Sequence, residues 1–413
     1  MVELGAWMRE QRWFGAKAAD MTHFGVLETV PLTDKLSLEL VEARFNSGVH
    51  DLYQLLVCGE DRDASPASLA RLMVENAHAG PIHFHWTGAL PAPAADATAR
   101  PMGAEQSNST LVIGEALALK VFRRLLPGDN PELEMLRFLQ SHGFENIAAL
   151  AGWYELAGER MEATLGVLQR FVADGRDGWE FALSEPQAFL ERAHDLGAVT
   201  GRLHSVLASD ATDPDFAPEE PGDEALGLLV ATIDEEIERA FVELRDDDEA
   251  VAPIRGRSQE LRERLQLLSH QSAGGRLIRQ HGDYHLGQTL IGPDGWIILD
   301  FEGEPARSLP ERRRKRSPLR DAAGMLRSFA YAASAKDLPD GWESEARRSF
   351  LEGYFGTVEP MLMPAGEAAI AKLLSIHELE KAIYELRYEL NNRPDWVPIP
   401  VAAIERLLDE SLA

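Results

Sequence analysis

Apolar and polar residues alternate in short runs over the first part of the chain, a pattern typical of β-strands. The clearest runs cover residues 36–45 and 51–57, and turn residues separate them. Residues 91–101, which follow, are rich in Pro and Ala and lack both helical and strand periodicity. The pattern predicts a strand-rich unit over residues 1–90 and a boundary after it.

Two partly β-branched apolar runs, residues 110–113 and 116–122, are separated by a Gly-Glu pair and predict a hairpin. Lys120 lies inside the second of these strands. Asn130 and Pro131 then supply an N-cap and a first-turn proline ahead of leucines at helical spacing. The sequence therefore predicts a helix soon after the strand that carries Lys120.

A further apolar run, residues 165–172, is followed by the glycine-punctuated segment 174–178. Such a segment is suited to a hinge between two lobes. In the rest of the chain the apolar residues mostly recur at helical spacing, and the last long helix is expected over residues 366–391. We predict an α+β protein with one unit over residues 101–174 and a mostly helical unit over residues 175–413.

Composition and charge exclude several classes of protein. The chain has 41 Lys and Arg against 68 Asp and Glu, a formal net charge of −27, so its surface repels nucleic-acid phosphates. Charged residues interrupt the N-terminal segment, unlike an export signal, and no apolar run approaches the roughly 18 residues of a membrane span. The single Cys58 cannot form an internal disulfide. We expect a cytoplasmic protein that binds neither nucleic acid nor a membrane.

The densest group of chemically active side chains occurs in two neighbouring motifs. HGDYHLGQ covers residues 281–288, and WIILDFEGEP covers residues 296–305. Phosphoryl transfer needs one carboxylate that accepts the proton of the acceptor hydroxyl, and it needs oxygen ligands for Mg²⁺ beside the nucleotide phosphates. Asp283, Gln288 and Asp300 can meet these needs.

A chain this acidic must supply a local cation for the phosphates of a nucleotide. Lys120 is the candidate, because a strand lysine serves this purpose in kinases and is held there by a carboxylate on the following helix. Glu134 is the preferred partner of Lys120 by its order in the sequence, and Glu132 is the alternative.

The H-G-D-x-H-x-x-Q and D-F-E motifs resemble those of the aminoglycoside phosphotransferase and choline kinase superfamily, whose fold is the two-lobed protein kinase-like fold. The longer strings HGDYHLGQ, LDFEGEP, SPLRDAAGMLRSFAYAA and QRWFGAK resemble the bacterial maltokinases. The similarity runs over nearly the whole chain. It implies a cap domain over residues 1–90, an ATP-binding N-lobe over 101–174 and a helical C-lobe over 175–413.

The resemblance also implies roles for individual residues. Asp283 would be the catalytic base, Gln288 and Asp300 would be ligands of Mg²⁺, and Lys120 would bind phosphate of ATP. No glycine-rich nucleotide motif occurs in the phosphate-covering turn, so hydroxyl and backbone groups would replace it there. The residues expected in this turn are Ser107, Asn108 and Ser109, and those expected at the adenine edge are Gln169, Phe171 and Val172.

The expected sugar site lies on the polar face of the last long helix, where Tyr384, Arg387 and Tyr388 offer stacking and hydrogen bonds. His285 and Glu302 of the two motifs are expected beside the sugar as well. The resemblance implies that ATP and maltose give ADP and maltose 1-phosphate, which feeds glycogen and α-glucan synthesis from trehalose-derived maltose. An enzyme that converts trehalose to maltose is then an expected partner.

Alternatives stay open at this point. The nearest is a kinase of another sugar, such as glucosamine or an aminoglycoside, because a chain this acidic can accommodate a cationic acceptor. A metal-dependent hydrolase is a remoter one, since His281, Asp283 and His285 at alternate positions could bind a transition metal. A non-catalytic scaffold is the last.

Overall fold

The computed structural model describes residues 2–409, apart from residues 16, 18–20, 65, 103–107, 160, 223, 246, 270–273, 306 and 337. The chain forms two compact units, Met1–Asp174 and Gly175–Ala413. Within the described ranges, none of the helices is both long enough and apolar enough to cross a membrane.

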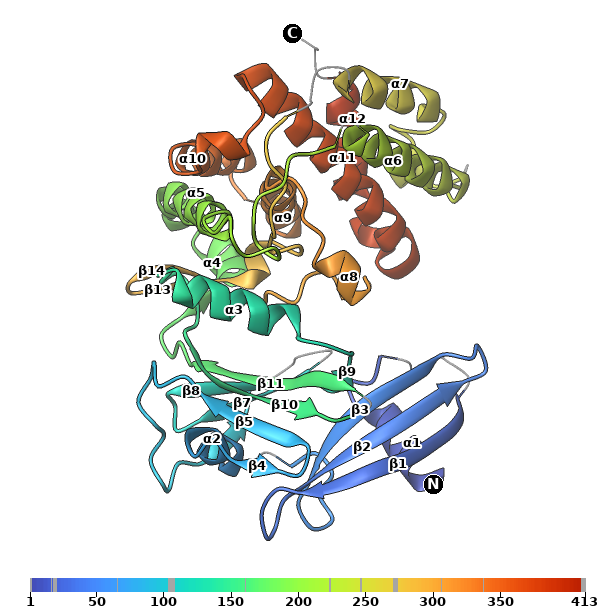
Figure 1. Ribbon diagram of the computed structural model, residues 1–413. Helices are drawn as coiled ribbons and strands as arrows, with labels where there is room; N and C mark the ends of the chain where they lie inside the picture. The colour runs from blue at the N-terminus through green and yellow to red at the C-terminus, as the bar shows by residue number, and fades with distance from the viewer. Residues whose placement is uncertain are drawn as a thin grey trace. The chain divides into compact units, whose positions relative to one another are not determined.

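The first unit is built mainly from strands (Figure 1). Its strand orders are β1-β2-β3-β9 in one sheet and β4-β5-β10-β11-β8-β7-β6 in another. The elements are α1 (Val2–Glu10), β1 (Met21–Pro31), β2 (Ser37–Phe45), β3 (His50–Val57), α2 (Ser68–Val74), β4 (His78–Ala79), β5 (Ile82–Trp86), β6 (Ala99–Pro101), β7 (Ser109–Ile113), β8 (Leu117–Val121), β9 (Arg124–Leu125), α3 (Pro131–Ser141), β10 (Leu150–Ala157) and β11 (Glu162–Arg170).

The residues before and after the Pro/Ala segment share their sheets. Strand β5 pairs with β10, and β3 pairs with β9, which follows directly after β8. The hairpin expected around Lys120 is present, with Thr110 opposite Lys120 in β7 and β8. Residues 1–90 and 101–174 therefore lie within one compact unit and share hydrogen-bonded strands.

Strand β2 is buried on both of its faces, which explains how the N-terminal sheet is held. Leu38 and Leu40 enter the core that also contains β5, β8 and α2, whereas Val41 and Ala43 pack with Trp13 in the core beneath α1. Successive side chains of a strand point to opposite faces of its sheet. The sheet is thus covered by apolar side chains on both sides.

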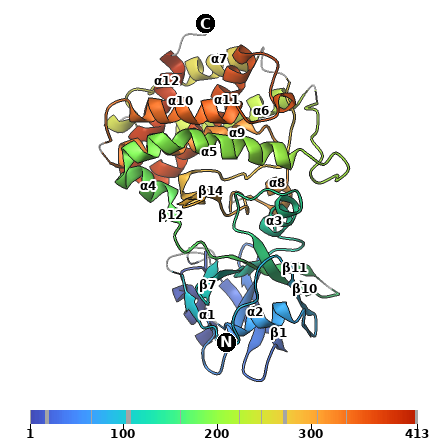
Figure 2. The ribbon, with the colours of Figure 1, turned by 90° about the vertical axis from the view of Figure 1, so that its left-hand side faces the viewer.

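The second unit is mostly helical, and Figure 2 shows α5 running beside α10. Its elements are β12 (Arg176–Asp177), α4 (Gly178–Ser184), α5 (Pro186–Leu207), α6 (Ala225–Val242), α7 (Ser258–Ser269), β13 (Thr289–Gly292), β14 (Gly295–Ile298), α8 (Leu309–Arg312), α9 (Leu319–Ala335), α10 (Trp342–Phe355), α11 (Glu367–Asn392) and α12 (Pro398–Asp409), with the 3₁₀ turns η1 (Glu249–Val251), η2 (Leu286–Gln288), η3 (Pro360–Leu362) and η4 (Pro394–Trp396).

Glycines bring α5 and α10 into backbone contact. A Cβ atom on Gly197 would collide with the carbonyl oxygen of Phe350, and one on Gly353 would collide with that of His194. The last long helix, α11, covers Glu367–Asn392, as its apolar spacing predicts. Its polar face is partly covered midway along the helix, where Glu380 is paired with Arg320 of α9. Helix α6 ends at Val242, before the acidic residues Glu243, Asp247, Asp248 and Glu249.

Candidate active site

One face of helix α9 supports the loop that carries Asp283. Asp321 Oδ2 accepts the backbone N–H of His281 at 2.8 Å, and Asp321 Oδ1 accepts that of Gly282 at 3.0 Å. One and two turns further on, Gly324 leaves room for the carbonyl of Tyr284, and Ser328 Oγ accepts the N–H of Leu286 at 3.2 Å. Residues at this spacing share one face of a helix. Helix α9 therefore fixes the backbone on both sides of Asp283.

The imidazole of His281 fixes the same loop from the other side. Its Nε2–H donates to the carbonyl of Leu299 at 2.8 Å, which leaves Nδ1 as the acceptor for the N–H of Asp283 at 3.4 Å. The ring contacts the rings of Tyr284 and Phe301, with centroid distances of 5.2 and 5.1 Å. His281 thus links Asp283 to the strand end that precedes Asp300.

Asp321 keeps its negative charge although it is buried. Burial alone would raise its pKa, but the hydrogen bond and charge of His204, together with His281 and the backbone N–H of Gly282, hold the pKa of Asp321 below its ordinary value. His204 Nε2 lies 3.2 Å from Asp321 Oδ2, and His204 Nδ1 lies 3.0 Å from the hydroxyl of Tyr354. Sequence reasoning missed Asp321 as a site residue, although the quoted string SPLRDAAG contains it.

Gln288 and Asp300 lie together within the second unit. Gln288 Nε2 donates to Asp300 Oδ2 at 3.2 Å, and the N–H of Leu299 donates to the carbonyl of Gln288 at 2.9 Å. Asp300 has a left-handed φ of 61°, which costs free energy for a residue other than glycine. The backbone therefore turns at Asp300 directly after the hairpin of β13 and β14.

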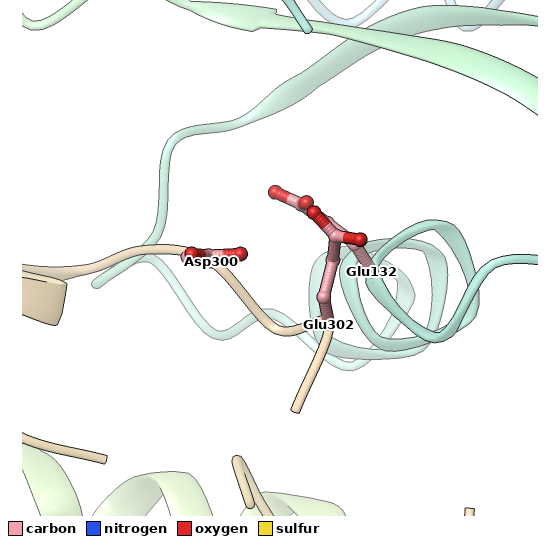
Figure 3. A group of neighbouring side chains, drawn as sticks. All are labelled: Glu132, Asp300 and Glu302. Atoms are coloured by element: carbon pink, nitrogen blue, oxygen red, sulfur yellow. The ribbon is translucent and has the colours of Figure 1, made fainter. Parts of the chain in front are cut away.

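Glu302 lies beside Asp300 on the same segment, and a carboxylate oxygen of each lies within 4.8 Å of the other (Figure 3). Two carboxylates and an amide are oxygen donors of the kind that Mg²⁺ prefers. The donor chemistry of Gln288, Asp300 and Glu302 therefore fits this ion. The sequence places Glu302 beside the sugar, whereas the structure places its carboxylate beside that of Asp300.

Within the first unit, Lys120 is paired with Glu132. Lys120 Nζ donates to Glu132 Oε2 at 2.7 Å, and Gln169 Nε2 donates to Glu132 Oε1 at 2.9 Å. Glu132 is fully buried at the start of α3, where Asn130 accepts its backbone N–H. The preference of the sequence for Glu134 as the partner of Lys120 is therefore wrong. Glu132 is the residue that the capped first turn directs toward β8 and β11.

The residues expected around the nucleotide differ in how far the structure describes them. Ser107 lies outside the described residues. Asn108 is buried, and Ser109 begins strand β7, with its Oγ accepting Arg123 Nε–H at 2.8 Å. This contact was not expected, because Arg123 is adjacent to Ser109 only in the folded sheet.

The expected adenine edge follows the end of β11. The N–H of Phe171 donates to the carbonyl of Ala116 at 2.8 Å, and the side chain of Gln169 is bound to Glu132. Val172, the next residue, is half-buried. The backbone N–H of Phe171 and the side-chain amide of Gln169 are therefore already engaged within the protein. A base at this edge would have to bind other backbone groups.

The expected sugar residues of α11 divide into two groups. Tyr384 and Tyr388 are 49% and 45% exposed and their rings are stacked, with centroids 6.5 Å apart. Arg387 instead donates to Glu236 in α6 at 2.6 Å and to Glu243, the residue directly after α6, at 3.2 Å. The structure therefore brings the tyrosines together and uses Arg387 to join α11 to α6.

His285 is constrained by its own loop. Its Nδ1 accepts the N–H of Gly287 at 3.1 Å and so caps the turn η2. Burial lowers the pKa of His285, while the charge of Asp283 acts in the opposite direction. A neutral His285 beside Asp283 favours a hydrogen-bonding role over that of a cation.

A cluster of ion pairs next to the Asp283 loop was missed at the level of sequence. Glu304 Oε1 accepts from Arg320 Nη2 and from Lys381 Nζ, both at 2.9 Å, and Arg320 Nε donates to Glu380 at 3.2 Å. Arg320 Nη1 also donates to the carbonyl of Gly282 at 3.3 Å. Burial would raise the pKa of both glutamates, but Arg320, with Lys381 at Glu304, holds each pKa below its ordinary value.

Two family models match separate parts of the chain. Residues 98–303 match the family model of the phosphotransferase enzyme family, and residues 7–87 match that of the maltokinase N-terminal cap domain. A glucosamine kinase of Streptacidiphilus jiangxiensis is 26% identical over 75% of this chain and 73% of its own length. One of Mycolicibacterium smegmatis is 24% identical over 75% of this chain and 80% of its own.

Solved structures show the same fold. A glucosamine kinase in complex with glucosamine, ADP and inorganic phosphate superimposes with a TM-score of 0.73 and 19% identity, over 96% of each chain. Crystal form A of glucosamine kinase gives a TM-score of 0.73 at 21% identity, over 96% of this chain and 94% of that one. The chain thus belongs to the phosphotransferase enzyme family, as a kinase-like enzyme preceded by a maltokinase-type N-terminal cap domain.

Proposed function

We propose that this enzyme transfers the γ-phosphoryl group of ATP to maltose and yields maltose 1-phosphate. The observation that carries the choice of acceptor is the ion-pair cluster beside the Asp283 loop. Glu304 and Glu380 are already neutralised by Arg320, Lys381 and Arg307. A cationic acceptor would need carboxylates that are not yet paired, so this environment favours a neutral sugar.

The stacked tyrosines of α11 support a sugar longer than one ring. Beyond Tyr388, the guanidinium of Arg393 lies 5.3 Å from the Tyr388 ring and 5.0 Å from the Trp396 ring. Trp396 in turn stacks on Tyr331 at 5.7 Å. Aromatic faces stack on the apolar faces of sugars and leave the sugar hydroxyls to polar neighbours. Tyr384 and Tyr388 are the exposed members of this row, and their two rings offer more stacking surface than a single sugar ring uses.

Asp283 would act as the general base. Its carboxylate would accept the proton of the anomeric hydroxyl while the new bond from that oxygen to the γ-phosphorus forms and the bond from phosphorus to the departing ADP oxygen breaks. The backbone of Asp283 is held by Asp321 and His281, so its position costs little reorganisation during the reaction. Lys120, held by Glu132, would bind phosphate oxygens of ATP.

Mg²⁺ would be held by Asp300 and Gln288, with Glu302 next to Asp300. When bound, the ion supplies positive charge that compensates the phosphate oxygens. Rotation of the Gln288 amide would present its oxygen in place of the nitrogen that now faces Asp300. In a cell the product would feed α-glucan synthesis, and an enzyme that converts trehalose to maltose would supply the substrate.

Glucosamine is the second candidate acceptor, and the names of the curated relatives favour it. We propose a panel of maltose, glucosamine, an aminoglycoside and glucose, each incubated with Mg²⁺ and ATP. A parallel set of reactions omits the ATP. We expect maltose to give the highest kcat/KM and Asp283→Asn to lose at least about 100-fold in kcat. A higher kcat/KM for glucosamine would overturn the choice of maltose as the acceptor. Hydrolysis of a sugar in the reactions without ATP would overturn the assignment as a kinase.

A further inference from the structure

Arg123 is a buried arginine two residues beyond β8, the strand of Lys120. Only 2% of its side chain is exposed. Its Nε–H donates to Ser109 Oγ at 2.8 Å, and its Nη2–H donates to the carboxylate of Asp63. Ser109 is the first residue of β7 and one of the residues expected to cover the phosphates of ATP. Asp63 belongs to the N-terminal cap.

A second group of the cap holds the same guanidinium. Arg123 lies over the ring of Trp13, 5.1 Å from its centroid, and Trp13 is only 6% exposed. Trp13 is packed in the core beneath α1, together with Tyr53. The guanidinium therefore contacts a ring and a carboxylate of the cap and a hydroxyl of the kinase sheet.

The surrounding backbone leaves Arg123 little freedom. The carbonyl of Arg123 accepts the N–H of Gln54 at 3.0 Å, and the side chain of Gln54 donates to the carbonyl of Phe122 at 2.7 Å. Gln54 is fully buried in β3 of the cap. The cap thus fixes both the main chain and the side chain at this position.

Arg123 determines how the hydroxyl of Ser109 is oriented. A serine hydroxyl has one proton to donate, and the arginine N–H can only be the donor in their contact. The hydroxyl proton of Ser109 must then point away from Arg123. Because the arginine is charged, this contact is of the stronger kind. A hydroxyl oriented in this way is suited to donate to an anionic oxygen, such as that of a nucleotide phosphate.

Stability alone does not account for a buried arginine at this position. Removing a guanidinium from water is costly, and a buried ion pair is often no more stabilising than apolar residues of similar size. Within the described residues, Nη1 of Arg123 has no hydrogen-bond partner. The contacts that are made connect the cap to the start of β7 and set an orientation there.

We propose that Arg123 is a positioning residue through which Asp63 and Trp13 of the cap hold Ser109 ready to bind a phosphate of ATP. The proposal rests on the proposed function in that ATP is the phosphoryl donor. It gives the cap a role in nucleotide affinity, although the described part of the cap contributes no residue to the assigned catalytic group.

The neighbouring residue offers a matched control. Arg124 donates to Asp51 at 2.7 Å, so it also forms a pair with an aspartate of the cap. The Arg124 side chain is 51% exposed and Asp51 is 10% exposed, so this pair is solvated at its arginine end and contributes less than a fully buried pair. Asp51→Asn therefore removes a pair between the same two segments without touching Ser109.

The test compares Asp63→Asn, Ser109→Ala, their double variant and Asp51→Asn in the full chain. The Kd for ATP is measured without sugar, and KM for ATP and for sugar are measured separately, each with a melting temperature. We expect Asp63→Asn and Ser109→Ala each to weaken ATP binding by about 10-fold, the scale of one charge-assisted hydrogen bond. The KM for sugar and the Kd of Asp51→Asn for ATP should stay within about twofold, because the pair of Asp51 with the half-exposed Arg124 does not contact Ser109.

If Arg123 connects Asp63 to Ser109, the two single variants interrupt the same chain of contacts. The double variant should then have a Kd for ATP no higher than that of whichever single variant binds ATP more weakly. Arg123→Lys, which keeps the charge but not the fork of donors, should repeat the loss of ATP affinity if Asp63→Asn fails to fold. Equal effects of Asp63→Asn and Asp51→Asn, or a lower melting temperature with unchanged Kd, would overturn the proposal. Because the Kd needs no acceptor, failure of every sugar would count against the proposed function alone.

Discussion

The carboxylate of Asp321 accepts the backbone N–H of His281 at 2.8 Å, although forty positions separate them in the chain. The same oxygen lies 3.2 Å from His204 Nε2 on α5. One buried anion therefore joins α5, α9 and the loop of Asp283. This arrangement makes Asp321 a positioning residue for the proposed catalytic base.

Asp321→Asn should reduce kcat more than it changes the KM for ATP, because the amide can offer one oxygen where the carboxylate offers two. We expect a loss of kcat of roughly 10- to 100-fold and a loss of stability of about 2 kcal/mol, the scale of a broken buried polar contact. Steady-state kinetics and chemical unfolding measure the two effects. Ser328→Ala, which removes the contact to Leu286 and the hydrogen bond of the hydroxyl to the carbonyl of Met325 in its own helix, is the milder control. An unchanged kcat in Asp321→Asn would contradict the assigned role.

Glu132→Gln should weaken the positioning of Lys120, since the charged partner of the ammonium becomes a neutral amide. We expect kcat/KM for ATP to fall by about 10-fold, which corresponds to the difference between a charge-assisted and a neutral hydrogen bond. Glu134→Gln, two positions further along the same helix, should change it by less than about threefold. Kinetics of both variants at saturating sugar measure the contrast, and equal losses would refute the pairing as the functional one.

The low pKa of Glu304 predicts how stability depends on pH. Because its pKa in the folded state lies below the ordinary value of 4.5, its charge stabilises the fold above about pH 4.5. That contribution is lost as the pH falls from there through the folded-state pKa. Glu304→Gln should therefore melt well below the wild type at pH 7, and the gap should narrow below about pH 4.5.

Melting temperatures from pH 7 to about pH 3.5 measure this gap. Glu235→Gln is the control, because the carboxylate of Glu235 is 64% exposed and its pair with Arg239 contributes little. A gap of constant size over the whole range would show that Glu304 acts through packing rather than through its charge.

Gly197→Ala should destabilise the second unit, because the added methyl group would collide with the carbonyl of Phe350 in α10. We expect a cost of about 3 kcal/mol or more, at the upper end for an overpacked contact, seen as a lower denaturant midpoint. Gly227→Ala in α6, where a Cβ atom meets nothing within 4 Å, should be neutral or stabilising by up to about 1 kcal/mol. Similar behaviour of the two variants would argue against the close approach of α5 and α10.

The sequence by itself determined the elements that depend on local pattern. Apolar spacing predicts α11 nearly to its ends, and the β-branched runs around Lys120 predict the hairpin of β7 and β8. It also determined which residues carry the proposed chemistry, since Asp283, Gln288 and Asp300 lie in two short motifs. Local periodicity and motif spacing depend only on neighbours along the chain, which the sequence displays directly.

Only the tertiary structure decided which distant residues meet. Lys120 is paired with Glu132 rather than Glu134 because the capped first turn of α3 sets which carboxylate faces the sheet. Asp321 supports His281, and Arg123 joins Asp63 to Ser109, through contacts between segments far apart in the chain. Such pairs follow from the packing of helices and sheets, which local spacing does not encode, so the order of residues alone could not reveal them.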